Sequence, residues 1–227
     1  MEEKYSLLSN VLKTLQNAEV LNELILAGSW CQYYYRILFD MAPEIPLIRT
    51  TDIDFLVPNP QKISKSLDVA KLLNDIGFDN DFDYQTGLLK FVNPDLEIQF
   101  ITPALGRGKD KPYEIRQFNI NAEGLRYLIL LQDHKFQMTH EGITLWLPEP
   151  GAYILHKILV SQKRKNDAKR DKDLMAAGNI GELCIRYEHH KNNLKSIFNG
   201  MPQKWRKQTL DILSQQSLRI HSFLSNG

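Results

Sequence analysis

The chain has 227 residues, of which 43% are hydrophobic, and this is enough to bury the core of one or two domains. Lys and Arg together number 28 and Asp and Glu number 27, so the formal net charge is +1. This balance argues against a protein that coats nucleic acid, although it is compatible with a local basic patch. The two cysteines, Cys31 and Cys184, are far apart in sequence, so neither a thiolate zinc site nor a disulfide framework is expected.

The sequence carries no targeting or membrane signal that we can identify. Its N-terminus reads Met-Glu-Glu-Lys and no long apolar run follows, so we expect no signal peptide. The longest apolar runs, such as 128–131, are far too short to span a bilayer. Two free thiols are typical of a reducing compartment. We therefore expect a cytoplasmic protein without a membrane partner.

The first hundred residues alternate between helical and strand-like patterns. The spacing of apolar residues predicts helices over 4–17, 30–39 and 62–76, and strands over 24–27, 52–57, 88–92 and 96–102. Loops are expected at 41–46, which holds two prolines, and at 93–95, between the last two strands.

Helical patterns dominate the second half of the chain. A loop over 105–112, a strand over 115–120, a helix over 122–132 and a strand pair over 136–138 and 143–147 are predicted first. Helices follow over 151–164, 167–177, 180–198 and 202–223, with breaks at Gly178, Gly200 and Pro202. This is an α+β outline, and both a domain boundary near 103–121 and one compact unit fit it.

Two carboxylates lie close together on the strand predicted over 52–57. Side chains alternate across a strand, so Asp52 and Asp54 point to one face and Ile53 points to the other. Carboxylates about 6–7 Å apart repel each other unless a cation lies between them. Mg²⁺ prefers oxygen ligands and often bridges carboxylates to substrate phosphates. The alternative is a solvated polar strand face that holds no ion.

A Gly-Ser pair separates the first predicted strand from the second predicted helix. Gly28 allows backbone amides to approach a phosphate closely, and Ser29 adds a hydroxyl at a helix N-terminus, which favours an anion. An ordinary strand–turn–helix with a serine cap has the same local pattern. The Thr51-Asp-Ile-Asp segment that follows favours the interpretation of this pair as a phosphate-binding turn.

Gly-Ser, a helix and then Ser/Thr-Asp-x-Asp on the next strand resemble the nucleotidyltransferase fold of the DNA polymerase β superfamily. The resemblance implies that Asp52 and Asp54 bind Mg²⁺, or Mn²⁺ in its place, and that Gly28 and Ser29 hold the phosphates of a nucleotide. It places Thr51 beside the nucleotide as well.

The same resemblance implies a fold and a domain arrangement. We expect a mixed sheet with helices in the N-terminal half, followed by a mainly helical C-terminal half. Residues 1–103 would form the catalytic core, and residues 104–227 would complete the active-site cleft.

The family also has a third carboxylate on a later strand, and this chain departs from its pattern there. Relatives often read acid-Phe-Leu-Thr-Pro, which would put the acid at position 99, where this chain has Gln99. Glutamine cannot act as a general base or supply a charged ligand. Glu97 shares the same strand face and takes the catalytic role in our preferred interpretation. A site with two carboxylates and a site with impaired catalysis are the alternatives.

A second departure is the long gap between Ser29 and Asp52, which a surface-loop insertion over 41–46 explains at little entropic cost. Arg49 ends this gap and can reach a phosphate, unless it is an ordinary surface charge.

A basic run lies in the helical half. Its members are Lys157, Lys163, Arg164, Lys165, Lys169, Arg170 and Lys172. We predict that Lys157 contacts the nucleotide, because it follows an apolar stretch that gives its head group a defined place and because the resemblance implies a lysine at this position. The rest of the run fits a cationic wall for a nucleotide or RNA, or a solvated linker whose charge nearby aspartates partly neutralise.

The resemblance implies an enzyme that moves a nucleoside monophosphate from an NTP such as ATP to a hydroxyl acceptor and releases pyrophosphate. The acceptor is a protein, a tRNA or a small molecule. Segments over about 20–178 resemble a bacterial nucleotidyltransferase-like subgroup that is distantly similar to AbiE-type toxins. Two alternatives follow, namely a toxin with an antitoxin partner, and an inactive protein that binds a nucleotide or a partner.

Overall fold

The computed structural model describes residues 2–46, 50–61, 63, 65–104, 106, 111–216 and 219–225. The chain forms two compact units. The first, here called the sheet unit, comprises Met1–Cys31 and Ile48–Leu147, and the second, the helical unit, comprises Gln32–Leu47 and Pro148–Gly227. The expected division into a catalytic core over 1–103 and a C-terminal region over 104–227 that completes the cleft stays a prediction.

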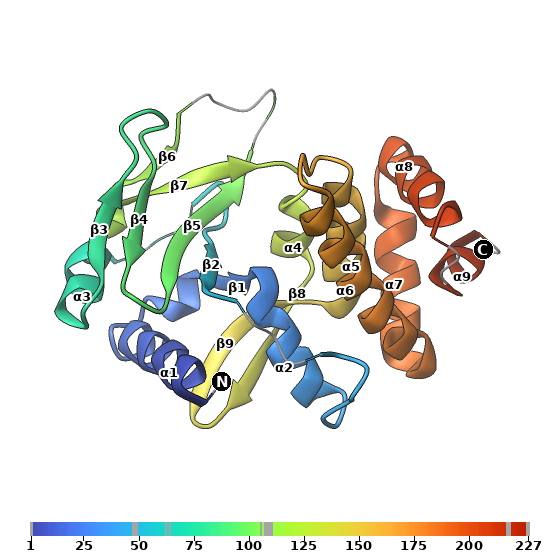
Figure 1. Cartoon of the computed structure of the whole chain (residues 1–227), viewed down its shortest axis with the longest axis horizontal. Helices are drawn as coiled ribbons and strands as arrows, with labels where there is room; N and C mark the ends of the chain where they lie inside the picture. Colours follow the sequence, from blue (N-terminus) through green and yellow to red (C-terminus); the bar gives the residue numbers. More distant parts are fainter. Residues whose placement is uncertain are drawn as a thin grey trace. The chain divides into compact units, whose positions relative to one another are not determined.

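A mixed sheet forms the body of the sheet unit (Figure 1). Its strands are β1 (Ile25–Ala27), β2 (Asp52–Leu56), β3 (Asp79–Phe82), β4 (Leu89–Val92), β5 (Glu97–Pro103), β6 (Tyr113–Ile115), β7 (Ile120–Leu125), β8 (Lys135–His140) and β9 (Ile143–Pro148). Their order is β3-β4-β5-β2-β1-β9-β8, while β7 pairs with both β5 and β6. β2 runs parallel to β5 and antiparallel to β1. The predicted mixed sheet is therefore confirmed.

The helices of the sheet unit are α1 (Glu2–Asn17), α3 (Val69–Asp75) and α4 (Ile129–Asp133). α1 buries Leu8, Val11, Leu12 and Leu15, which recur at helical spacing. The side chain of Gln16 fixes the end of α1 to the β8–β9 hairpin, because it donates to the Gly142 carbonyl and accepts from the Thr144 amide.

Two predicted segments of this unit are wrong in type or length. The helix expected over 62–76 begins only at Val69, where the carboxylate of Asp68 accepts from the Lys71 amide and caps it. The strand predicted over 115–120 and the helix predicted over 122–132 are replaced by β6, a 3₁₀ turn, β7 and α4. Pairing of β7 with β5 and β6 overrides the local helical pattern.

The helical unit is built from α5 (Pro150–Ser161), α6 (Asp167–Arg186), α7 (Glu188–Gly200), α8 (Gln203–Ser214), α9 (Arg219–Ser225) and most of α2 (Cys31–Leu38). α2 belongs here because Tyr35 donates a buried hydrogen bond to the Pro148 carbonyl and packs edge-on against Tyr153. The mainly helical second half is confirmed, but the break expected at Gly178 is wrong, since α6 continues through it. No helix in the described part of the chain is long and apolar enough to cross a membrane.

Candidate active site

The two predicted metal-binding carboxylates lie on the same face of β2. Ile53 between them is fully buried, so it fixes the strand against the core and leaves Asp52 exposed and Asp54 half-buried. Asp54 lies opposite Ala27 of β1, which immediately precedes the predicted phosphate turn. The alternation of side chains along one short strand therefore determines the direction of both carboxylates.

Gly28 lies directly against Asp54. Its backbone has φ +66°, a conformation that residues with a side chain rarely adopt. A Cβ atom at this position would be 1.8 Å from Oδ2 of Asp54. Gly28 begins the 3₁₀ turn Gly28–Trp30, which contains Ser29 and leads into α2. The structure thus brings the predicted Gly-Ser turn and the second carboxylate together.

β5 contributes the next two side chains. Its parallel register places Glu97 beside Asp52 and Gln99 beside Asp54. The amide nitrogen Nε2 of Gln99 donates a hydrogen bond to Oδ1 of Asp54. Position 99 therefore presents a neutral donor to Asp54, whereas Glu97 is the carboxylate that lies opposite Asp52.

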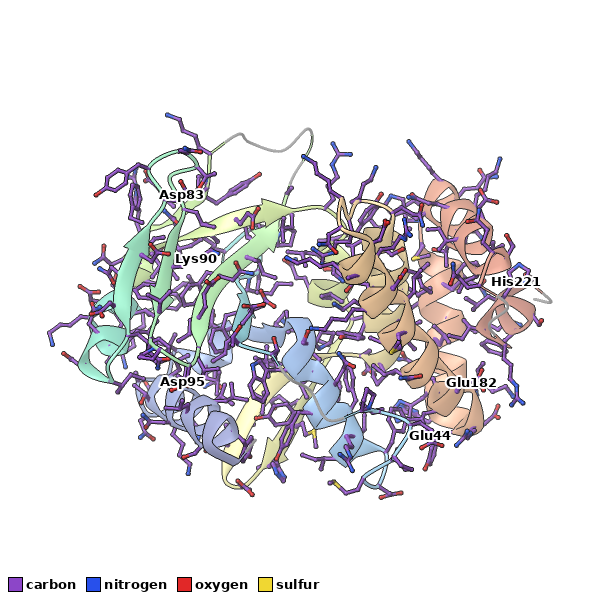
Figure 2. All side chains as sticks on the ribbon, viewed as in Figure 1. Glu44, Asp83, Lys90, Asp95, Glu182 and His221 are labelled. Carbon is purple, nitrogen blue, oxygen red and sulfur yellow. The ribbon has the colours of Figure 1, made fainter. Side chains whose placement is uncertain are left out.

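Lys90 of β4 is a site residue that the sequence analysis did not identify. Its Nζ is 2.6 Å from Oε1 of Glu97, and its side chain is 30% exposed (Figure 2). Burial lowers the pKa of Lys90, but the hydrogen bond and charge of Glu97 and the charges of Asp52 and Asp81 outweigh it and hold the pKa above its usual value. Lys90 therefore stays a cation beside the carboxylates.

The register of the β4–β5 hairpin was the signal that would have revealed this pair. Val92 lies opposite Glu97, so Lys90, two residues earlier, shares the face of Glu97 on the neighbouring strand. The predicted turn at 93–95 exists, and Asn93 closes it by accepting from the amides of Asp95 and Leu96.

The donor chemistry of Asp52 and Asp54 fits Mg²⁺ or Mn²⁺, both of which take carboxylate oxygens and fill their other positions with water and phosphate oxygens. Within the described residues, no group of three or more His, Cys, Asp or Glu side chains is placed to hold a metal ion. The carboxylates of Asp52 and Asp54 have the donor chemistry that such an ion requires.

The threonines before β2 support Asp52. The hydroxyl of Thr50, which is buried, accepts from the Asp52 amide, and the hydroxyl of Thr51 donates to the Asp52 carboxylate at 3.3 Å. Arg49, a predicted phosphate contact, lies outside the described residues.

Lys157 is placed in the helical unit, on α5, where it is only 8% exposed. Its Nζ is 2.7 Å from Oδ1 of Asp173, and Nε of Arg164 donates to Oδ2 of the same carboxylate at 2.8 Å. Burial raises the pKa of Asp173, but these two cations outweigh it and hold the pKa below its usual value. The predicted contact of Lys157 with a nucleotide stays a prediction.

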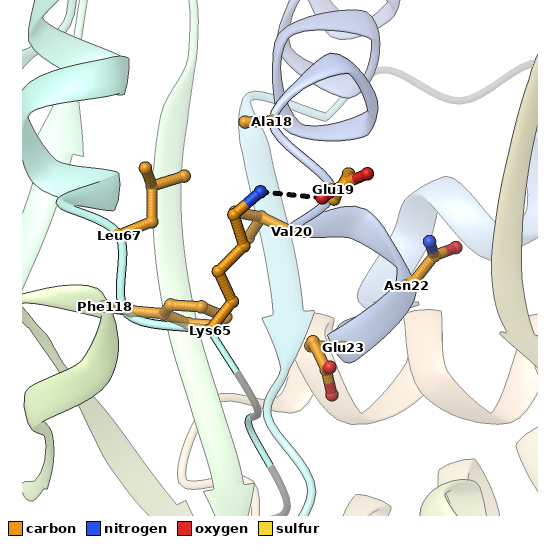
Figure 3. Close-up of a pocket in the computed structure, with 8 residues that line it drawn as sticks. All are labelled: Ala18, Glu19, Val20, Asn22, Glu23, Lys65, Leu67 and Phe118. Atoms are coloured by element: carbon orange, nitrogen blue, oxygen red, sulfur yellow. Dashed lines mark hydrogen bonds and ion pairs between the residues drawn. The ribbon is translucent and has the colours of Figure 1, made fainter.

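A pocket of about 260 Å³ lies elsewhere in the sheet unit. Lys65 and Glu19 form an ion pair of 2.7 Å at its edge, and Leu67 and Phe118 supply apolar walls (Figure 3). None of the residues that line it belongs to the predicted site.

Comparisons with known proteins identify a family and a similar fold. A family model described as Nucleotidyltransferase matches residues 6–197. No curated protein matches the chain. Among solved structures, the antigenic nucleotidyltransferase-like protein from Paracoccidioides brasiliensis has a TM-score of 0.53 at 14% identity, over 97% of this chain and 91% of that one. ANT(2")-Ia in complex with adenylyl-2"-tobramycin has a TM-score of 0.46 at 12% identity, over 95% and 99%.

At identities this low, structural similarity concerns the fold alone, and it agrees with the mixed sheet and helical second half described above. The family match is broader, because it extends from α1 into α7 and includes the strands that carry Asp52, Asp54 and Glu97. Because this family model matches most of the chain, the chain belongs to a nucleotidyltransferase family.

Proposed function

We propose that this chain is a metal-dependent nucleotidyltransferase that moves a nucleoside monophosphate from an NTP, ATP among the candidates, to a hydroxyl acceptor. The observation that carries the proposal is the alignment of Asp52 and Asp54 on one face of β2, with Gly28 packed against Asp54. Two rigid carboxylates beside a turn that admits phosphate are what nucleotidyl transfer requires.

In this mechanism Asp52 and Asp54 hold Mg²⁺ or Mn²⁺, which when bound would neutralise phosphate charge and make the attacking hydroxyl more acidic. The turn at Gly28 and Ser29 would hold the phosphates, and the missing Cβ of Gly28 leaves room for the carboxylate of Asp54 beside them. Ser29, Arg49, Thr51 and Lys157 stay predicted contacts of the nucleotide, each open to test by substitution.

The transfer itself exchanges one phosphorus–oxygen bond for another. The acceptor oxygen bonds to the α-phosphorus, and the bond from that phosphorus to the oxygen that bridges to the β-phosphate breaks. Pyrophosphate leaves, and the hydroxyl proton passes to a base. We assign that role to Glu97, whose Oε1 accepts from Lys90 and whose Oε2 would take the proton.

The acceptor is a protein side chain, a tRNA end or a small molecule. One form of this proposal is a toxin that uses the same chemistry on tRNA or protein and is restrained by an antitoxin. We also propose that the protein is cytoplasmic. An inactive member that only binds a nucleotide is the rival, and the pairing of Gln99 with Asp54 and of Lys90 with Glu97 favours it.

The test is to incubate the purified protein with each α-³²P-labelled NTP and Mg²⁺, with and without total tRNA. We expect label on protein, RNA or a small acceptor, and a decrease of about 100-fold or more in Asp52→Asn and Asp54→Asn. Asp95→Asn is the matched control, because Asp95 is an exposed turn residue of the same unit (Figure 2).

Each outcome separates the candidates. Nucleotide binding without transfer would identify the inactive member, and neither binding nor transfer would overturn the proposal. Growth arrest on expression that Asp52→Asn relieves would identify the toxin.

A further inference from the structure

Four charged side chains share one face across three neighbouring strands. Lys90 lies on β4, Glu97 on β5, and Asp52 and Asp54 on β2. The parallel register of β2 and β5 and the antiparallel register of β4 and β5 put them all on the same side of the sheet.

Their formal charges do not suit a site for two divalent ions. On β2, β4 and β5, three carboxylates and one ammonium group leave a charge of −2, which a single divalent ion balances, and the exposed Asp81 on the edge strand β3 is not counted in this sum. Gln99 adds no charge, since it binds Asp54 through its neutral amide. A carboxylate at position 99 and a neutral residue at position 90 would together have left −4.

Lys90 is well placed to act as a permanent counter-ion. Its contact with Glu97 is 2.6 Å, and both side chains are only about a third exposed, at 30% and 32%. A partly buried ion pair is screened less by salt than a surface pair, so a dilute metal ion must compete with a cation that is already in place. Asp81, opposite Lys90 on β3, shares this face at the exposed edge of the sheet, and its charge also favours the charged form of Lys90.

We propose that Lys90 is a positioning residue that keeps Glu97 out of the metal coordination sphere, so that the protein itself holds one divalent ion, on Asp52 and Asp54. Glu97 then stays available as the proton acceptor, with its direction set by Lys90. This inference rests on the proposed function, since it concerns the same metal site.

The proposal predicts what happens when the counter-ion is removed. In Lys90→Met, Glu97 loses its partner and becomes a third carboxylate beside Asp52, so the site gains a ligand and one unit of negative charge. Its affinity for a divalent ion should rise. Lys90→Arg keeps the positive charge and should behave like the unaltered protein, although its longer side chain changes the geometry.

The experiment is a titration of the full chain with Mn²⁺ in the absence of nucleotide, with free Mn²⁺ measured by electron paramagnetic resonance at constant ionic strength. We expect one Mn²⁺ per chain in the unaltered protein, loss of binding in Asp52→Asn, and binding at least about tenfold tighter in Lys90→Met. Lys71→Met is the matched control, because it removes an equal charge from an exposed ion pair with Asp75 on α3.

The outcomes distinguish the inference from the proposed function. Two Mn²⁺ ions of comparable affinity in the unaltered protein, or unchanged or weaker binding in Lys90→Met, would overturn the role of Lys90 and leave the proposed enzyme intact. No Mn²⁺ binding by the unaltered protein, or binding that Asp52→Asn does not affect, would overturn the metal site and this inference with it. Tighter binding in Lys71→Met as well would reduce the effect to net charge and reject the assignment.

Discussion

The carboxylate of Asp54 occupies the space that a side chain at position 28 would fill, and Gly28 has no side chain. A Cβ atom at position 28 would be 1.8 Å from Oδ2 of Asp54 and 2.8 Å from its Cγ. Because the backbone of Gly28 also has a positive φ of +66°, any other residue there would be strained and would displace the carboxylate. The predicted phosphate turn and the carboxylate that we propose as a metal ligand are thus one structural element.

Gly28→Ala should therefore damage the site more than it damages the fold. We expect nucleotidyl transfer to fall by about 100-fold, because a displacement of about 1 Å at a reacting group has this effect. The free energy of unfolding should fall by roughly 1–2 kcal/mol from the strained backbone. The measurements are label transfer from α-³²P-labelled NTP and unfolding in urea.

Gly142→Ala is the control for backbone strain. Gly142 also has a positive φ, +76°, but nothing lies within 4 Å of the Cβ that it would gain. It should lose similar stability and keep its activity. Equal activity losses in the two variants would show that the contact between Gly28 and Asp54 does not matter for catalysis.

The directions of Asp52 and Asp54 could be predicted from sequence because they depend on alternation within one strand. The partners of these carboxylates could not. The hairpin turn expected over 93–95 brings the strands of Lys90 and Glu97 together, but whether Gln99 donates to Asp54 depends on the register between β2 and β5, which a local pattern does not determine.

The same limit applies to secondary structure in the middle of the chain. Residues of β7 carry a local pattern that favoured a helix, yet pairing with β5 and β6 makes them a strand. Lys157 was predicted to reach a nucleotide from a place fixed by its apolar neighbours, whereas the structure buries it and pairs it with Asp173. Its partner Asp173 is on the next helix, so the ion pair depends on how α5 and α6 pack.

Asp173 is the second position at which we predict a large effect. It is 4% exposed and accepts from both Lys157 and Arg164, so Asp173→Asn leaves a buried ammonium group without its counter-charge. Breaking such a pair from one side costs about 3–5 kcal/mol. We expect the free energy of unfolding in urea to fall by this amount, and Lys157→Met in the same chain to restore part of it.

Asp171→Asn is the matched control for this variant. Asp171 is exposed and lies 3.7 Å from Arg170, so its loss should change stability by no more than about 0.5 kcal/mol. A cost at Asp173 as small as that at Asp171 would contradict the buried ion pair.

His156 makes stability depend on pH. Its burial, and secondarily the charge of Lys157, lower its pKa from 6.5 to about 3, with Asp173 opposing the shift. Because the folded pKa lies below the unfolded value, the unfolded chain binds the extra proton between these limits, and stability falls as pH drops below about 6.5. The contribution of His156 is about 1.4 kcal/mol per pH unit within that range.

His156→Leu should therefore lose less stability than the unaltered protein between pH 7.5 and pH 5. The measurement is the free energy of unfolding in urea at several pH values, and the readout is its slope with pH. His189→Gln, at an exposed position of the same unit, should leave the slope as it is. Parallel slopes for His156→Leu and the unaltered protein would mean that His156 is not held neutral by burial.

Gly181 lies inside helix α6, where it leaves room for a side chain of α9. The pattern of Gly178 suggested that α6 stops there, but the helix continues to Arg186, and Gly181 on it makes room for Ile220 of α9. A Cβ at Gly181 would lie 1.8 Å from Cδ1 of Ile220. Helix propensity alone would make Gly181→Ala stabilising by about 1 kcal/mol, whereas overpacking costs about 1–3 kcal/mol.

We expect the packing term to prevail, so Gly181→Ala should lower the free energy of unfolding in urea. Adding Ile220→Ala removes both clashing atoms, Cδ1 at 1.8 Å and Cγ1 at 2.6 Å, and should make the cost of Gly181→Ala much smaller, although Ile220→Ala alone costs about 2–5 kcal/mol. The double-mutant cycle isolates the contact between these two positions. Gly200→Ala, with nothing within 4 Å of its new Cβ, is the control, and it should not share the loss. An increase in stability in Gly181→Ala would show that α9 does not pack against α6 as described.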